Sequence, residues 1–198
     1  MRIKSYISYS QFVTWKAGPE AYRKAYIFGY QFSNKYTKFG SKIHEALELR
    51  KAEDEDGRTA ISIIPMAQRR EVVVERTIRG VPLFIRMDGT YKSRVGYAIK
   101  EYKTSKNGWT QAQVDRNEQL TFYVAVWSAK LKVPVNEIRL VLECVRTFED
   151  NDGTVHLTGQ KQRFETWRTR KEVNELLPKV KKAWIGIEKL ITEASKIK

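Results

Sequence analysis

Between residues 70 and 103 the sequence consists of alternating and β-branched runs, and this pattern restricts the fold more than any other feature of the chain. Two interruptions divide the runs, Gly80-Val81-Pro82 and the segment 93–96. Alternation broken by short turns is typical of antiparallel neighbours in a sheet. The sequence therefore predicts a three-stranded meander with strands at residues 71–78, 83–91 and 97–103.

Two more strands are predicted at residues 137–147 and 154–165, because Asn151-Asp152-Gly153 between them is a strong hairpin signal. Helical spacing of apolar residues predicts short helices on either side of Gly18-Pro19 and longer ones at residues 38–51, 111–131 and 171–196, the last with a kink at Pro178. The acidic run 53–57 indicates a solvated loop. The expected fold class is α/β, a mixed sheet of about five strands flanked by helices.

The composition limits both the number of domains and the kinds of partner. The chain has 198 residues, of which 41% are hydrophobic, so we expect one domain spanning residues 1–198. Its 37 basic and 23 acidic residues give a formal charge of +14, which favours a polyanion such as nucleic acid. No apolar run approaches the roughly 20 residues of a membrane-spanning helix.

Cysteine usage points to a reducing environment. Cys144 is the single cysteine of the chain, which excludes an intrachain disulfide and a cysteine-ligated cluster or zinc site within one chain. A cytoplasmic location, or the host cytoplasm for a viral protein, is the expectation.

Asp88, Glu101 and Lys103 form the group that best suggests chemistry. If the strands carrying Asp88 and Glu101 pair around the turn at 93–96, the two carboxylates face each other, and Lys103 shares the face of Glu101. A divalent metal would resolve the repulsion between the acids, and the lysine would offset charge on a phosphate during hydrolysis. On these residues alone, an ordinary surface ion-pair ladder remains the alternative.

Further segments occur in an order that is more specific than any of them alone. They are Ile7-Ser8-Tyr9-Ser10-Gln11-Phe12 with Gly18-Pro19, the run from Phe39 to Leu47, Asp88, the run from Glu101 to Ser105, and the run from Gln119 to Tyr123. Over residues 7 to 127 the chain resembles the RecB-like nucleases of the PD-(D/E)XK superfamily. This resemblance implies a restriction-endonuclease-like core and metal-dependent cleavage of DNA.

The resemblance also assigns roles to residues of this chain. His44, Asp88 and Glu101 would hold Mg²⁺ or Mn²⁺, and Lys103 would be the catalytic lysine. Gln119 and Tyr123, which share a helix face at i and i+4, would shape the active site. Without the resemblance, His44 and Tyr123 would be read as residues at a helix border or in the core, and Gln119 as solvated.

The chain departs from the family pattern at two places. Relatives with an iron-sulfur cluster have a cysteine where this chain has Gly18 and a cysteine group near the C-terminus, so no cluster is expected and packing must hold the two ends together. Arg86 stands where a glycine often precedes the metal-binding aspartate by two residues, and it would bring another cation towards the phosphate.

DNA, single- or double-stranded, is the expected partner. Candidate contacts are Arg86, Lys106, Trp109 and Arg116, with Lys100, the segment 168–182 and the aromatic residues between Tyr22 and Tyr36 as further candidates. The resemblance favours an end-directed exonuclease in DNA recombination, repair or viral DNA processing, and a homo-oligomer or a recombination or replication partner is possible. The alternatives are a structure-specific endonuclease, an RNA-directed enzyme and a non-catalytic nucleic-acid-binding protein on the same fold.

Overall fold

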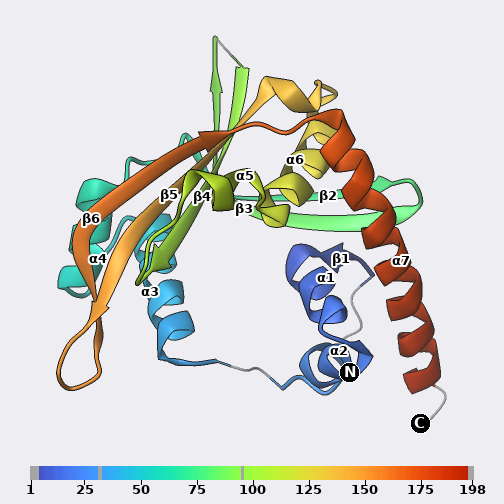
Figure 1. Cartoon of the computed structure of the whole chain (residues 1–198), viewed down its shortest axis with the longest axis horizontal. Coiled ribbons are helices and arrows are strands. Elements are labelled where there is room, and N and C mark those ends of the chain that lie inside the picture. The colour runs from blue at the N-terminus through green and yellow to red at the C-terminus, as the bar shows by residue number, and fades with distance from the viewer. Residues whose placement is uncertain (1–4, 31–32, 95, 196–198) are drawn as a thin grey trace.

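The computed structural model describes residues 5–30, 33–94 and 96–195 (Figure 1). Six strands form one mixed sheet in the order β1-β3-β4-β5-β6, and β2 pairs with the other edge of β3. Their bounds are β1 Ile7–Ser8, β2 Arg69–Ile78, β3 Val81–Ser93, β4 Gly96–Ser105, β5 Ile138–Glu149 and β6 Val155–Thr166. The five predicted strands are confirmed as β2 to β6. The two-residue β1 was not predicted, because two residues carry no readable alternation.

The sheet is forked between β3 and β4. These strands pair only from Ser93 with Gly96 to Gly89 with Lys100, after which β4 continues beside β5 and β3 continues beside β2. Further along the edge of β3 that β4 has left, β1 pairs with Leu83 and Phe84. Asp88 and Glu101 are therefore the first residues past the last β3–β4 pair, in the register that the sequence predicts.

Nine helical segments connect the strands in the described residues: α1 Tyr9–Lys16, α2 Pro19–Tyr22, η1 Arg23–Ile27, α3 Lys35–Leu49, α4 Glu55–Ile63, α5 Gln111–Asp115, α6 Glu118–Leu131, η2 Val135–Glu137 and α7 Arg170–Ser195. α7 continues past Pro178, and Lys196, where the predicted helix ends, lies outside the described residues. No helix in the described ranges is long and apolar enough to cross a membrane.

Two predictions about helices are wrong because a side chain caps a helix that the sequence pattern did not reveal. Residues 111–131 form two helices, because the Asn117 side chain accepts a hydrogen bond from Leu120 N (3.0 Å) and starts α6 anew. The acidic run predicted as a loop opens α4, since Asp54 caps it by accepting from Gly57 N at 2.9 Å. Glu55 and Asp56 then lie in the first turn, where negative charge suits the helix dipole.

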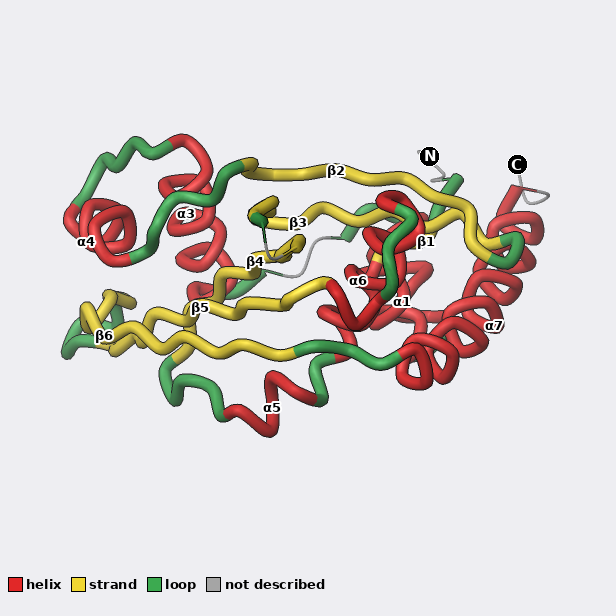
Figure 2. Tube along the Cα trace, turned by 90° about the horizontal axis from the view of Figure 1, so that it is seen from above, coloured by secondary structure: helices red, strands yellow, loops and turns green. Residues whose placement is uncertain are grey.

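The helices gather at opposite ends of the sheet (Figure 2). At one end α1, α6 and α7 pack on the main core, in which Leu83, Leu140 and Leu142 are fully or almost fully buried. At the other end α3 and α4 form a smaller core with Tyr102, Val145 and Leu157. The fork of the sheet lies between these two cores.

Close packing joins the N- and C-terminal helices. α1 contacts α7, and a Cβ at Gly186 would lie 2.3 Å from the indole Cζ2 of Trp15. Trp15 also packs against Tyr22, with ring centroids 5.8 Å apart. Glycine at position 186 thus permits the two helices to approach.

Candidate active site

The fork of the sheet places two carboxylates side by side. Asp88 Oδ2 accepts a hydrogen bond from the backbone N–H of Tyr102 at 2.6 Å, which fixes this aspartate against the neighbouring strand. Glu101 is 3% exposed, and its Oε1 accepts from Lys103 Nζ at 2.6 Å. Because Glu101 and Lys103 are two apart on β4, the pleat directs both to one face.

The first turns of α6 complete this polar cluster. Gln119 Oε1 accepts from Lys103 Nζ at 3.0 Å, while Gln119 Nε2 donates to Glu101 Oε1 at 2.8 Å and to Tyr123 Oη at 2.8 Å. Gln119 and Tyr123 face the same way because they are one helical turn apart. The amide of Gln119 therefore links the acid, the lysine and the tyrosine.

His44 reaches the cluster from α3. Its Nδ1 lies 3.4 Å from Asp88 Oδ1, and its ring meets the Tyr102 ring edge-on with centroids 6.4 Å apart. The position follows from the amphipathic pattern of α3, which buries Ile43 and Leu47 in the smaller core. The structure thus brings together all six side chains proposed from the sequence: His44, Asp88, Glu101, Lys103, Gln119 and Tyr123.

Burial determines the electrostatics of Glu101. Loss of solvent and the negative charge of Asp88 raise the pKa of Glu101 to about 7, against the opposing ammonium of Lys103. This carboxyl group therefore exchanges its proton near neutral pH. A cation that binds to Glu101 would compete with that proton.

The acids around them raise the pKa of both His44 and Lys103. Burial opposes protonation of His44, but the contact with Asp88 and the negative charges of Asp88 and Glu101 outweigh it, so the pKa of His44 is raised. Burial likewise opposes the ammonium of Lys103, yet the charge and hydrogen bond of Glu101 raise the pKa of that lysine. Lys103 is consequently a cation throughout the physiological range.

One carboxylate oxygen at the fork is left without a hydrogen-bond partner. Glu101 Oε2 is buried without a hydrogen-bond partner, which is costly unless a ligand or ion completes it. Magnesium is commonly held by one or two carboxylates together with water and substrate phosphate. Within residues 5–30, 33–94 and 96–195, no three His, Cys, Asp or Glu side chains are arranged as a ready-made metal cage.

Glu71 is a neighbour that sequence reasoning missed. It lies opposite Asp88 across β2 and β3, between the pairs Arg70 with Gly89 and Val72 with Met87. Its backbone has φ of 46°, and its Oε2 lies 3.5 Å from Arg86 Nε. Burial and the charge of Asp88 raise the pKa of Glu71. Glu75, four residues further along β2, is exposed and pairs with Phe84.

The proposed DNA contacts separate into exposed and structural residues. Arg86 is exposed and lines a hollow of about 230 Å³ beside the site, together with Ser8, Ser10, Gln119 and Tyr123. Lys106 and Arg116 are exposed as well. Trp109 is half-buried against the main core, and Gln162 hydrogen-bonds both its backbone N–H and its carbonyl.

Two other basic candidates are wrong because they are buried. Lys100 is 2% exposed and donates to Glu143 Oε2 at 3.0 Å and to the carbonyl of Pro65. Arg168 is 1% exposed and donates to the carbonyls of Val114 and Asn117. Tyr22, from the aromatic segment, is also a core residue at 2% exposure.

Known proteins resemble this chain in structure. No family model matches the sequence, and no curated protein matches it. The "Putative exonuclease" of Eubacterium rectale superposes with a TM-score of 0.57 at 12% identity, over 96% of this chain and 86% of that one. The protein SSO0001 superposes with a TM-score of 0.51 at 16% identity, over 91% and 77% of the two chains. At these identities the likeness shows the fold alone, a mixed sheet flanked by helices.

Proposed function

We propose that this chain is a metal-dependent DNA nuclease, a RecB-like member of the PD-(D/E)XK superfamily. The observation that carries the proposal is the meeting of six side chains from α3, β3, β4 and α6 at the fork of the sheet. The alternative, an ordinary ion-pair ladder on the surface, fits less well, because Glu101 is only 3% exposed and one of its carboxylate oxygens is buried without a hydrogen-bond partner. The likeness of fold to a protein named as an exonuclease supports the same conclusion.

His44, Asp88 and Glu101 are the residues that would hold Mg²⁺ or Mn²⁺. When bound, such an ion lowers the pKa of water and polarises a phosphodiester. The backbone N–H of Tyr102 donates to Asp88 Oδ2 and so fixes the orientation of the Asp88 carboxylate. Glu101 offers its unpartnered Oε2.

Lys103 supplies the permanent positive charge of the site. It contacts Glu101 and Gln119 and keeps its proton because of the acids around it. Beside a scissile phosphate this ammonium would offset the negative charge that builds up during attack by water. Gln119 holds Lys103 and Glu101 in their relative positions, and Tyr123 restrains the amide of Gln119.

The substrate that fits this site is DNA, and the reaction is hydrolysis of the phosphodiester. The charge of +14 favours phosphate contacts of low sequence specificity, which suits an enzyme of DNA recombination, repair or viral DNA processing. Exposed Arg86 lies beside the fork, where it would contact the phosphate next to the cleaved one. End-directed cleavage is the preferred mode.

The test compares cleavage of linear duplex, single-stranded and covalently closed circular DNA, and of RNA, with Mg²⁺ or Mn²⁺. We expect the wild type to degrade linear DNA, to lose activity in EDTA, and to spare the closed circle. Lys103→Ala should lose cleavage by about 100-fold or more while binding DNA nearly as well as the wild type. Lys130→Ala removes an exposed lysine from the far end of α6 and serves as the matched control.

Each contrary outcome has a distinct meaning. Absence of metal-dependent cleavage on all four substrates, with DNA binding intact, would leave a non-catalytic binding protein. Cleavage of the closed circle would replace end-directed action with endonuclease action. An absorption band of an iron-sulfur cluster in the purified protein would contradict the metal-only site.

A further inference from the structure

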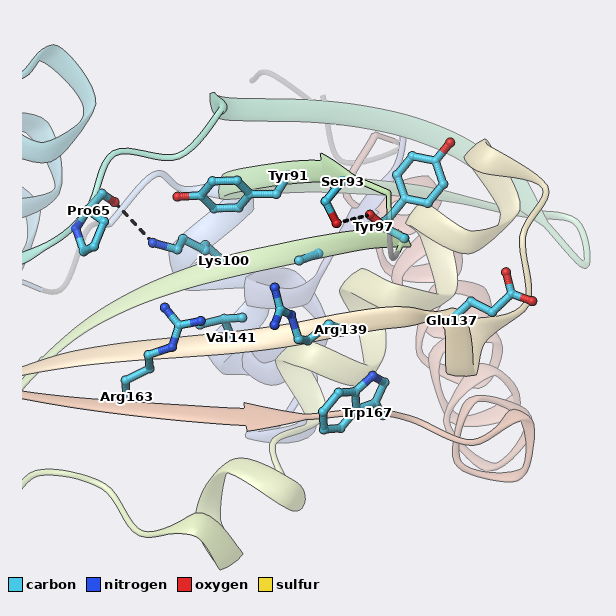
Figure 3. A pocket seen from close by; sticks show the side chains of 12 residues that line it. Pro65, Tyr91, Ser93, Tyr97, Lys100, Glu137, Arg139, Val141, Arg163 and Trp167 are labelled. Carbon is cyan, nitrogen blue, oxygen red and sulfur yellow. Dashed lines mark hydrogen bonds between the residues drawn. The ribbon is translucent and has the colours of Figure 1, made fainter.

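A second hollow, of about 480 Å³, lies away from the six side chains of the fork and is lined mainly by strands β3 to β6 (Figure 3). The strand register explains its floor. Tyr91 pairs with Ala98 and Ala98 with Arg139, so these residues form a row across three strands, while Lys100 and Val141 form the next row. Since Lys100 and Glu101 are consecutive on β4, their side chains leave opposite faces of the sheet.

The residues at the bottom of this hollow already satisfy one another. Lys100 and Glu143, 3% and 0% exposed at their side chains, are paired at 3.0 Å, and the ammonium of Lys100 lies 5.1 Å from the centre of the Tyr91 ring. Arg163 joins Glu143 to Glu165, with contacts of 3.3 Å and 2.6 Å. The charged groups of the floor are therefore paired with one another and do not require a ligand.

The walls are different, because they leave aromatic and cationic groups open to solvent. Trp167 is 51% exposed, although burying an indole is strongly favourable. The side chain of Arg139 is 39% exposed, and its Nη1 donates to both carboxylate oxygens of Glu165 at 3.4 Å. Figure 3 shows Arg139 near Trp167, which directly follows the end of β6 at Thr166.

This combination matches one class of ligand. Aromatic side chains stack on the faces of nucleic-acid bases, and an arginine beside them binds phosphate. Arg139 and Arg163 both contact Glu165, but Arg139 does so at 3.4 Å with its side chain 39% exposed, which leaves its guanidinium able to bind a phosphate. The hollow is large enough for one nucleotide and too small for a packed protein element.

We propose that this hollow is a nucleotide-binding site separate from the active site, with the base against Trp167 and the phosphate beside Arg139. The nucleotide can be free, as a nucleoside monophosphate released by cleavage, or a unit of a single strand. The inference does not require that the fork is catalytic.

The test titrates Lys103→Ala protein, which should not cleave, with dAMP and with a short oligodeoxyadenylate. Calorimetry and tryptophan fluorescence report binding. We expect dAMP to bind at least about tenfold more tightly than deoxyribose 5-phosphate, which lacks the base.

Adding Trp167→Ala or Arg139→Gln should weaken dAMP binding by about tenfold. Phe148→Ala and Arg146→Gln, an exposed aromatic and another arginine of β5, should leave it unchanged.

The two sources of the ligand give different results. Oligonucleotide binding stronger than dAMP binding, and lost with Trp167→Ala, assigns the hollow to a strand, whereas equal affinities assign it to the mononucleotide. The proposal is overturned if neither ligand binds, if Trp167→Ala has no effect, or if Glu101→Gln abolishes binding and so places the ligand at the fork. A concentration-dependent dimer that Trp167→Ala abolishes would assign the surface to a second copy of the chain and also overturn it. Loss of nuclease activity alone would not affect any of these readouts.

Discussion

At the scale of single residues, the candidate site depends on the interactions of one buried carboxyl group, that of Glu101. Glu101 has Lys103 and Gln119 on one oxygen and no partner on the other. Its pKa near 7 reflects burial together with the charge of Asp88. The Glu101 carboxyl group is therefore partly protonated near neutral pH, and its charge state depends on what binds beside it.

The stability of the metal-free protein should therefore fall as the pH rises from about 5 to 8. The folded state holds the Glu101 proton more tightly than the unfolded state, so Glu101 contributes stability below the unfolded pKa that is lost as pH rises through about 7. His44, whose pKa is also raised, acts in the same direction. Adding Mg²⁺ should raise the Tm by about 3 °C or more at pH 8 and by less at pH 6.

Thermal melts in EDTA and in MgCl₂ at both pH values measure this difference. Glu101→Gln removes the titrating group and should flatten the pH dependence of the metal-free Tm. An equal Mg²⁺ effect at pH 6 and pH 8 would show that the ion does not compete with the Glu101 proton.

Glu71 should strengthen metal binding through its charge. Because it lies opposite Asp88 in the sheet, Glu71→Gln removes one negative charge from the neighbourhood of the fork. We expect a metal affinity about fivefold weaker, which corresponds to about 1 kcal/mol. Isothermal titration with Mn²⁺ measures it. Glu75→Gln, on the same strand but exposed, is the matched control and should change the affinity little.

At the scale of elements, a buried arginine positions α6. Arg168 donates hydrogen bonds to Thr121 Oγ1, to Thr166 Oγ1 and to the carbonyls of Val114, Asn117 and Trp167. These bonds tie the break between α5 and α6 to the junction of β6 and α7. Since Gln119 stands two residues past that break, Arg168 fixes where the amide of Gln119 lies.

Arg168→Lys should keep the charge but lose most of the hydrogen bonds. We expect a loss of about 3 kcal/mol in the free energy of unfolding, measured with urea. At temperatures where the variant is folded, kcat should fall more than KM changes, because Gln119 is displaced from Lys103. Arg170→Lys, at an exposed position two residues on, should alter neither quantity. An unchanged kcat in the Arg168→Lys protein would show that Arg168 contributes to stability only.

The contact between α1 and α7 reverses a general rule about helices. Glycine inside a helix is ordinarily worth replacing, because alanine stabilises it by about 1 kcal/mol. At position 186 the added Cβ would meet Trp15 at 2.3 Å, so Gly186→Ala should destabilise the protein by about 1–3 kcal/mol. Combining it with Trp15→Leu should recover part of the loss in a double-mutant cycle. Additive effects of the two changes would contradict the contact.

Sequence reasoning succeeded where the pattern is long and local, and failed where the outcome depends on one side chain or a distant partner. The strands β2 to β6 and the register of Asp88 with Glu101 were predicted because alternation and the turn at 93–96 define them. The break before α6 was missed because it depends on Asn117 and on Arg168, 51 residues away. Glu71 was missed because its position requires the β2–β3 register and a left-handed backbone.

At the scale of the whole molecule, the excess of basic residues should dominate affinity for DNA. A chain with charge +14 that contacts several phosphates releases several counterions on binding. We expect the dissociation constant for a short duplex to rise by about 100-fold or more between 50 and 200 mM salt. Fluorescence anisotropy with the non-cleaving Lys103→Ala protein measures it, and a flat salt profile would contradict a phosphate-dominated interface.

The fork also has a consequence for the order of folding. Asp88 and Glu101 lie on a local hairpin, whereas β5 must reach β4 through a crossover that contains α5 and α6. Local contacts cost less loop entropy and form sooner than distant ones. The two acids should thus meet in the nascent hairpin before Gln119 and His44 arrive. Lys103 lies on the same hairpin, so of the six side chains it is the lysine that can offset the repulsion between the two acids at this early stage of folding.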